Sequence, residues 1–171
     1  MLRRIYIKNF ALLDELQFEL FSGLNILTGE TGAGKSILVE AIGLLLGDRA
    51  SGEMIRSDTE KAVVEGEFLV SHLPAIEKFL SENGYDLNQN LIIRREINSK
   101  GVNRIFVNDS PATQQIIKAL GNLIADLHGQ HEHQSLLNPE THGGFLDEFG
   151  HLIPQVESVR LAYDAVHQFQ N

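Results

Sequence analysis

The chain has 171 residues, of which 43% are hydrophobic, and it carries a formal net charge of −9. This length and apolar content are typical of one domain, or of one lobe of a larger domain, with enough hydrophobic residues for a real core. The sequence has no cysteine, which excludes disulfides and cysteine-based zinc sites, and no apolar run of membrane-spanning length, so we expect a cytoplasmic protein without a membrane partner.

Residues 2 to 28 predict strands. Leu16, Phe18 and Leu20 alternate with polar residues, which is the pattern of a half-buried strand. After a turn at Gly23, the run from Leu24 to Thr28 is almost continuously apolar, as in a buried parallel strand. We therefore expect this last strand to lie in a parallel core.

The next segment carries the chemistry. It reads Gly29-Glu30-Thr31-Gly32-Ala33-Gly34-Lys35-Ser36, a complete G-x-x-x-x-G-K-S phosphate loop (Walker A) between a predicted strand and a predicted helix. The glycines let successive backbone N–H groups face a polyphosphate, and the helix N-terminus adds partial positive charge. Lys35 would reach the β- and γ-phosphates, and the Ser36 hydroxyl would bind Mg²⁺. The alternative, a glycine-rich turn that happens to carry a lysine, does not explain why both flanks fit.

The phosphate loop opens a helix that we expect to run from Lys35 to about Leu46, with Gly47 at its C-cap. Residues 61 to 108 predict an antiparallel unit. Its first strand alternates apolar residues with Glu65 and Glu67, a short helix spans 74–80, and the strands 91–97 and 102–107 form a hairpin.

The hairpin is the one locally basic stretch of the sequence. Arg94, Arg95, Lys100 and Arg104 stand there against Glu96 alone. Two interpretations remain open, a solvated strand pair and a surface that contacts DNA. Because the rest of the chain is acidic, we expect any DNA binding to be weak and steeply dependent on salt.

Asp109-Ser110-Pro111 predicts the start of a helix that ends near Leu120, and the apolar run Leu123 to Leu127 predicts a second buried parallel strand. That strand would deliver the polar residues 128–134 to the edge of the sheet where α/β proteins bind ligands. His128, His131 and His133, with Glu132, suggest zinc as an alternative. Alternation along a strand would separate these histidines, so a polar loop beside the nucleotide is preferred.

The last stretch changes character. Apolar residues recur there at alternating steps of three and four, at Phe149, Leu152, Val156, Val159, Tyr163 and Val166, with Gln170 next. This a/d seam predicts the start of a coiled coil, and a surface helix of a globular protein is the alternative.

These segments together resemble the SMC-like ABC-type ATPases. The resemblance rests on Ile5–Ala11, on Gly23–Ser36 and on Glu40–Arg49. Within that group, Asp126–Gln134 and Phe145–Gly150 are similar to a branch that acts in bacterial DNA repair. The resemblance covers essentially the whole chain.

The resemblance implies an α/β P-loop fold: an ABC/SMC-type head lobe over residues 1–148, with a mixed sheet and an antiparallel β subdomain, and the start of a coiled-coil arm over 149–171. By the same resemblance, Lys35 and Gln130 act on the nucleotide, Ser36 and Gln130 hold Mg²⁺, and Arg56 or, as a competing candidate, Arg49 lies near the ATP. The implied nucleotide contacts are Gly29, Glu30, Thr31, Gly32, Ala33, Gly34, Lys35, Ser36 and Arg56.

The implied partners are the C-terminal half of the same protein, a second head in a homodimer, and DNA, in a cytoplasmic protein associated with the nucleoid. No strand of this sequence ends in the Asp-Glu of a Walker B motif, and no Leu-Ser-Gly-Gly signature is present. We therefore expect an N-terminal half-site that binds ATP and acts in double-strand break repair and recombination, with hydrolysis completed elsewhere. The alternatives are a transporter nucleotide-binding subunit and a nucleotide-gated clamp that does not hydrolyse ATP.

Overall fold

The computed structural model describes residues 1–28, 34–71, 73–86, 90–100, 102–125, 127 and 139–168. The chain forms two compact units, Met1–Ala125 and Asp126–Asn171. In the described part of the chain, no helix is both long and apolar enough to cross a membrane.

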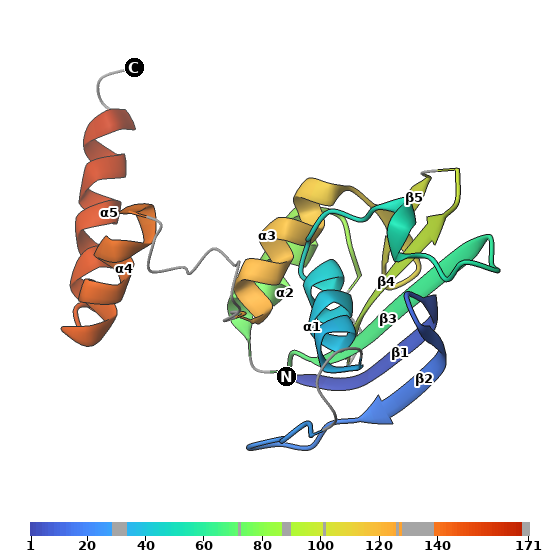
Figure 1. Cartoon of the computed structure of the whole chain (residues 1–171). Helices are drawn as coiled ribbons and strands as arrows, with labels where there is room; N and C mark the ends of the chain where they lie inside the picture. Colours follow the sequence, from blue (N-terminus) through green and yellow to red (C-terminus); the bar gives the residue numbers. More distant parts are fainter. Residues whose placement is uncertain are drawn as a thin grey trace. The chain divides into compact units, whose positions relative to one another are not determined.

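The first unit is built on a six-stranded sheet in the order β2-β1-β3-β4-β5-β6 (Figure 1). Every pairing in it is antiparallel. The strands are β1 (Leu2–Phe10), β2 (Leu13–Glu19), β3 (Lys61–Leu69), β4 (Asn90–Asn98), β5 (Asn103–Val107) and β6 (Ser110–Ala112). This confirms the predicted antiparallel unit over 61–108 and its hairpin.

The two faces of the sheet differ in chemistry because successive side chains alternate. On β3, Val64 and Phe68 are buried on the inner face, while Glu65 and Glu67 lie on the outer face. Outer-face residues pair across strands: Arg4 contacts Glu67 at 3.1 Å. The inner face is thus the core side, as the alternation in the sequence predicted.

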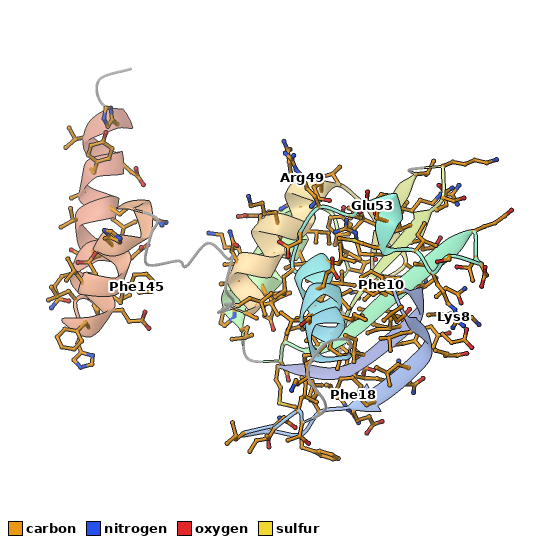
Figure 2. The ribbon with its side chains drawn as sticks, in the orientation of Figure 1. Lys8, Phe10, Phe18, Arg49, Glu53 and Phe145 are labelled. Atoms are coloured by element: carbon orange, nitrogen blue, oxygen red, sulfur yellow. The ribbon has the colours of Figure 1, made fainter. Side chains whose placement is uncertain are left out.

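Asn9 interrupts the alternation of β1. Its φ is 54°, in the left-handed region that asparagine tolerates better than most residues. As a result Phe10, two residues after the outward-facing Lys8, is fully buried instead of exposed (Figure 2). Phe10 also bridges Ile55, which fixes the segment after α1 against the end of β1.

Three helices cover the inner face of the sheet (Figure 1): α1 (Gly34–Leu45), α2 (Pro74–Glu82) and α3 (Gln114–Ile124), with a short 3₁₀ turn at Gly52–Met54. Each buries one apolar stripe, including Leu44 on α1, Leu80 on α2 and Leu120 on α3. Gly47 follows α1 with φ of 109°, which confirms the predicted glycine at the helix end.

The end of α1 and the helix α3 approach each other closely. A Cβ atom added at Gly121 of α3 would lie 2.1 Å from the carbonyl oxygen of Leu46. A Cβ atom at Gly47 would lie 2.6 Å from the Cα atom of Lys118. Glycine is therefore required on both sides of this contact, and α3 fixes the C-terminal end of α1 in place.

The prediction of a strand at 123–127 is wrong. Leu123 and Ile124 belong to α3, which begins at Gln114 rather than at residue 109, and Ser110–Ala112 is a strand. The Thr113 side chain caps α3 by accepting a hydrogen bond from the Ile116 N–H. A short apolar run has no periodicity of its own, so it could not be distinguished from the last turn of a helix.

The prediction of a strand at 24–28 is also wrong for this chain. These residues form no strand, and Leu24 and Ile26 are 88% and 73% exposed. A buried parallel strand needs neighbours on its edges and faces. Among the described residues nothing covers this run, and the parallel core predicted from it and from 123–127 is not formed.

The second unit holds α4 (Pro139–Phe149) and α5 (Ile153–Gln168). Between them His151 has φ of 54°, and the Leu152 N–H donates to the Asp147 carbonyl in a tight turn. The predicted seam is therefore not one continuous helix: Phe149 ends α4, and the seam runs along α5 from Val156 to Val166. The predicted boundary between head and arm at 148/149 stays a prediction, and Gln170 lies outside the described residues.

Candidate nucleotide-binding site

The N-terminal end of α1 is the described part of the phosphate loop. Gly34, Lys35 and Ser36 are exposed there, whereas Ile37 one position later is buried against the core. The first N–H groups of a helix have no partner within the helix, and they carry partial positive charge. The first turn of α1 contains no acidic residue that would compete for them. This end of α1 therefore fits an anionic phosphate group, with a cation and a hydroxyl at hand.

The other predicted members of the site are not all described. The loop residues 29–33 lie outside the described residues, as does Gln130. The histidine cluster at 128, 131 and 133 falls there as well, so the zinc alternative stays a prediction. Within the described residues, no group of three or more histidine and carboxylate side chains could hold a metal ion.

Arg56 is held against the first hairpin. Its Nη1 lies 3.2 Å from Oδ1 of Asp14, and its backbone N–H donates to the Asn9 carbonyl at 3.0 Å. A partly exposed ion pair of this kind is weak and exchanges readily with solvent. Arg56 is thus positioned by its backbone, and its role at the nucleotide stays a prediction.

Arg49 lies beyond the C-terminal end of α1 (Figure 2). At 1.5 Å per residue, the ten steps from Lys35 to Leu45 place that end about 15 Å from the phosphate-binding end. The role of Arg49 near the nucleotide stays a prediction.

The hairpin is not the basic surface that its composition suggested. Arg95 is fully buried on the core side of β4. Arg94 lies on the outer face among three carboxylates, with its Nη1 3.2 Å from Asp109, 3.8 Å from Glu65, and its Nε 3.6 Å from Glu96. Lys100 and Arg104 are the exposed cations that remain here. The interpretation as a solvated strand pair is favoured, because one of the four charges is buried and a second lies among carboxylates.

By sequence alone, Arg95 counts among the surface charges of the hairpin, whereas the structure places it in the core. It shares the inner face of β4 with Leu91, Ile93 and Ile97, and a charged residue in phase with apolar ones was the signal that it points inward. Its guanidinium donates to the carbonyls of Leu44 at 2.8 Å and Asp48 at 3.2 Å. Burial lowers the pKa of Arg95 to about 10, which still leaves it charged at neutral pH.

The fold is that of SMC ATPase heads. A solved structure described under "ATP-driven dimerization and DNA stimulated activation of SMC ATPases" matches 96% of this chain and 98% of its own, with a TM-score of 0.58 and 19% identity. The recombination mediator protein RecF, solved as RecF-ATPrS, matches 68% of this chain and 29% of its own, with a TM-score of 0.54 and 24% identity. These likenesses confirm the predicted fold class.

Residues 4–144 match the family model described as AAA domain, and the chain belongs to that family. It is also similar along its length to curated proteins named DNA repair protein RecN. The relative from Bacillus subtilis is 40% identical over 98% of this chain and 29% of its own length. The relative from Vibrio cholerae is 37% identical over 100% of this chain and 31% of its own length. The predicted resemblance to a DNA-repair branch is confirmed, and the chain spans about a third of these relatives.

Proposed function

We propose that this chain is the ATP-binding half of an SMC-like ATPase head that acts in the repair of DNA double-strand breaks and in recombination. The observation that carries the proposal is the end of α1, where the phosphate-loop residues Gly34, Lys35 and Ser36 are exposed on a helix whose other face is buried. The relatives named as DNA repair proteins supply the process. Such a protein would work in the cytoplasm, on the nucleoid.

The chain's own residues divide the work. The backbone N–H groups from 29 to 36 would donate hydrogen bonds to phosphate oxygens. Lys35 would neutralise charge at the β- and γ-phosphates, and the Ser36 hydroxyl would bind Mg²⁺. Gln130 would complete the Mg²⁺ site, and Arg56 would approach the nucleotide from the segment that packs on β1. Bound ATP would supply a phosphoanhydride bond, and whether this bond is intact or hydrolysed would control the engagement of two heads.

The exposed apolar residues on the approach to the phosphate loop support the half-head assignment. Leu24, Ile26 and Leu27 are exposed apolar residues within one segment of four, interrupted only by Asn25. Covering apolar surface releases about 25 cal/mol per Å², so such a run is stabilised by a partner. We assign that partner to the C-terminal half of the same protein, which would pair with these residues as a strand. A second head would then close over the nucleotide.

A direct map of the bound nucleotide tests the proposal. At 19.0 kDa the chain suits solution NMR, and addition of Mg²⁺-ATP should shift the backbone amide resonances of Gly34 to Ile37 and of the preceding loop. Resonances of the exposed tip of the β4–β5 hairpin, which carries Lys100, should stay unchanged. Shifts confined to the hairpin, or no shifts at millimolar ATP, would refute the phosphate-loop site.

DNA binding by this chain should be weak, with an affinity that falls steeply between 50 and 200 mM salt, because released counterions dominate contacts to phosphate. Replacing Lys100 and Arg104 with serine should lower it further, since both side chains are exposed. Arg94→Ser serves as the control, because its charge is already matched by carboxylates. Fluorescence anisotropy with labelled duplex DNA measures the affinity of the parent, the double variant and the control. Tight binding that does not depend on salt would contradict the expectation.

A further inference from the structure

The carbonyl groups at and just after the C-terminal end of α1 accept hydrogen bonds from side chains of other elements, in addition to those from the backbone N–H groups of residues 46–48. The last four carbonyls of a helix lack partners within it, and α1 has no basic residue in its last turn. Arg95 of β4 donates to the carbonyls of Leu44 and Asp48. Gln114, the first residue of α3, donates through Nε2 to the carbonyls of Gly47 and Asp48. Strand β4 and helix α3, both distant in sequence from α1, thus hydrogen-bond to the same end of α1.

Arg95 and Gln114 also bind each other. Nη2 of Arg95 lies 3.3 Å from Oε1 of Gln114, and Nε of Arg95 lies 3.3 Å from Oδ1 of Asn103. All the guanidinium nitrogens of Arg95 therefore have oxygen acceptors, and two of those acceptors are the carbonyl of Leu44 in the last turn of α1 and the carbonyl of Asp48 just after it. A cation placed at a helix C-terminus also interacts favourably with the helix dipole.

Burying the charge of Arg95 costs free energy, so the stability of the fold alone does not explain why a charged residue occupies this position. Arg95 is fully buried between apolar neighbours, and a hydrophobic residue of similar volume at such a position is often as stable or more stable. An apolar residue at this position could not make the directional hydrogen bonds to the carbonyls of Leu44 and Asp48. We therefore attribute to the guanidinium of Arg95 the task of fixing the position of the C-terminal end of α1.

The geometry of α1 matters because its two ends have different tasks. The N-terminal end presents Lys35 and Ser36, and the C-terminal end is fixed by the Arg95–Gln114 cluster and by the close contact between Leu46 and Gly121. A helix is stiff, so a small tilt at the fixed end displaces the phosphate-binding end. Displacements of about 1 Å in a site of this kind change binding and reactivity strongly.

We propose that Arg95 and Gln114 are positioning residues for the nucleotide: they hold the C-terminal end of α1 so that its phosphate-binding end is preorganised. The inference rests on the proposed function of α1. Coupling is reciprocal, so bound ATP in turn stabilises the cluster and the start of α3.

Nucleotide affinity of cluster variants tests the inference. Arg95→Met and Gln114→Leu should each raise the dissociation constant for Mg²⁺-ATP by about two- to thirtyfold, the range seen for residues that act on a ligand without contacting it. The double variant should lose little more than either single variant, because the two residues act as one unit. Asn103→Ala is the matched control, since it removes a bond to Arg95 but none to α1.

Hydrogen exchange and stability separate positioning from general destabilisation. In the two cluster variants, amides 44–48 should exchange faster in the absence of nucleotide. Ile117→Val, which trims the same helix α3 in the core, lowers the unfolding midpoint without touching the cluster, and its ATP affinity should stay at the parent value.

The outcomes are distinct. A folded Arg95→Met or Gln114→Leu with the parent's ATP affinity overturns the inference, as does an equal loss of affinity in Ile117→Val. If Arg95→Met does not fold, Gln114→Leu, whose side chain is only part-buried, decides the question alone. A parent chain that binds no ATP refutes the proposed function instead.

Discussion

Lys35→Ala is expected to weaken Mg²⁺-ATP binding by about thirty- to several-thousand-fold, which corresponds to about 2–5 kcal/mol for the loss of one partner in a desolvated charge pair. The reason is local: Lys35 stands at the exposed N-terminal end of α1, the end of the helix that carries partial positive charge. Bound phosphates would exclude water around it, so their negative charge would lose its nearest fixed cation. Isothermal titration calorimetry with ATP measures the effect.

The same variant should leave the fold intact, because the Lys35 side chain is exposed and α1 is anchored by its buried apolar residues and by the Arg95–Gln114 cluster at its other end. Far-UV circular dichroism and the midpoint of urea unfolding should match those of the parent. Lys78→Ala is the matched control, since Lys78 is an exposed helical lysine paired only with Glu82 at 3.8 Å. ATP affinity that is equal in the parent and in Lys35→Ala would refute the assignment of the phosphate loop.

Much of this fold followed from patterns within short segments. The alternation of β3, the hairpin from 90 to 107, and the helix between the phosphate loop and Gly47 all have a periodicity or a turn residue of their own. In the site, the placement of Lys35 and Ser36 on the first turn of α1 was predicted for the same reason. Each of these features is decided by neighbours in sequence.

The rest depends on contacts that sequence alone does not display. Leu123 and Ile124 are apolar in a helix or in a strand, and the cap at Thr113 and the close approach at Gly121 decide for the helix. The run from Leu24 to Thr28 would become a strand only with a partner to pair with. Arg95 was assigned to the surface from its charge, although its register on β4 placed it inside.

Negligible ATP turnover by this chain is the second large expected effect. Phosphoryl transfer to water needs an oriented water molecule and stabilisation of the charge on the γ-phosphoryl oxygens. Lys35, Ser36 and Gln130 are proposed to hold phosphate and Mg²⁺, and none of the three is a general base. Glu30 lies within the phosphate loop, and in the sequence Glu132 does not directly follow an apolar run as a Walker B glutamate does. The C-terminal half of the head and a second head would supply the missing groups.

The steady-state rate of phosphate release therefore tests the half-site account most directly. It should be measured on this chain alone and on the same chain joined through a shortened coiled coil to the C-terminal half of the head. The account predicts that the chain alone binds ATP with no turnover above the buffer background, and that the joined protein hydrolyses ATP at a rate of about 1 per second or more, within the usual enzyme range. Comparable turnover by the chain alone that is abolished by Glu132→Gln would contradict the account and make Glu132 the base.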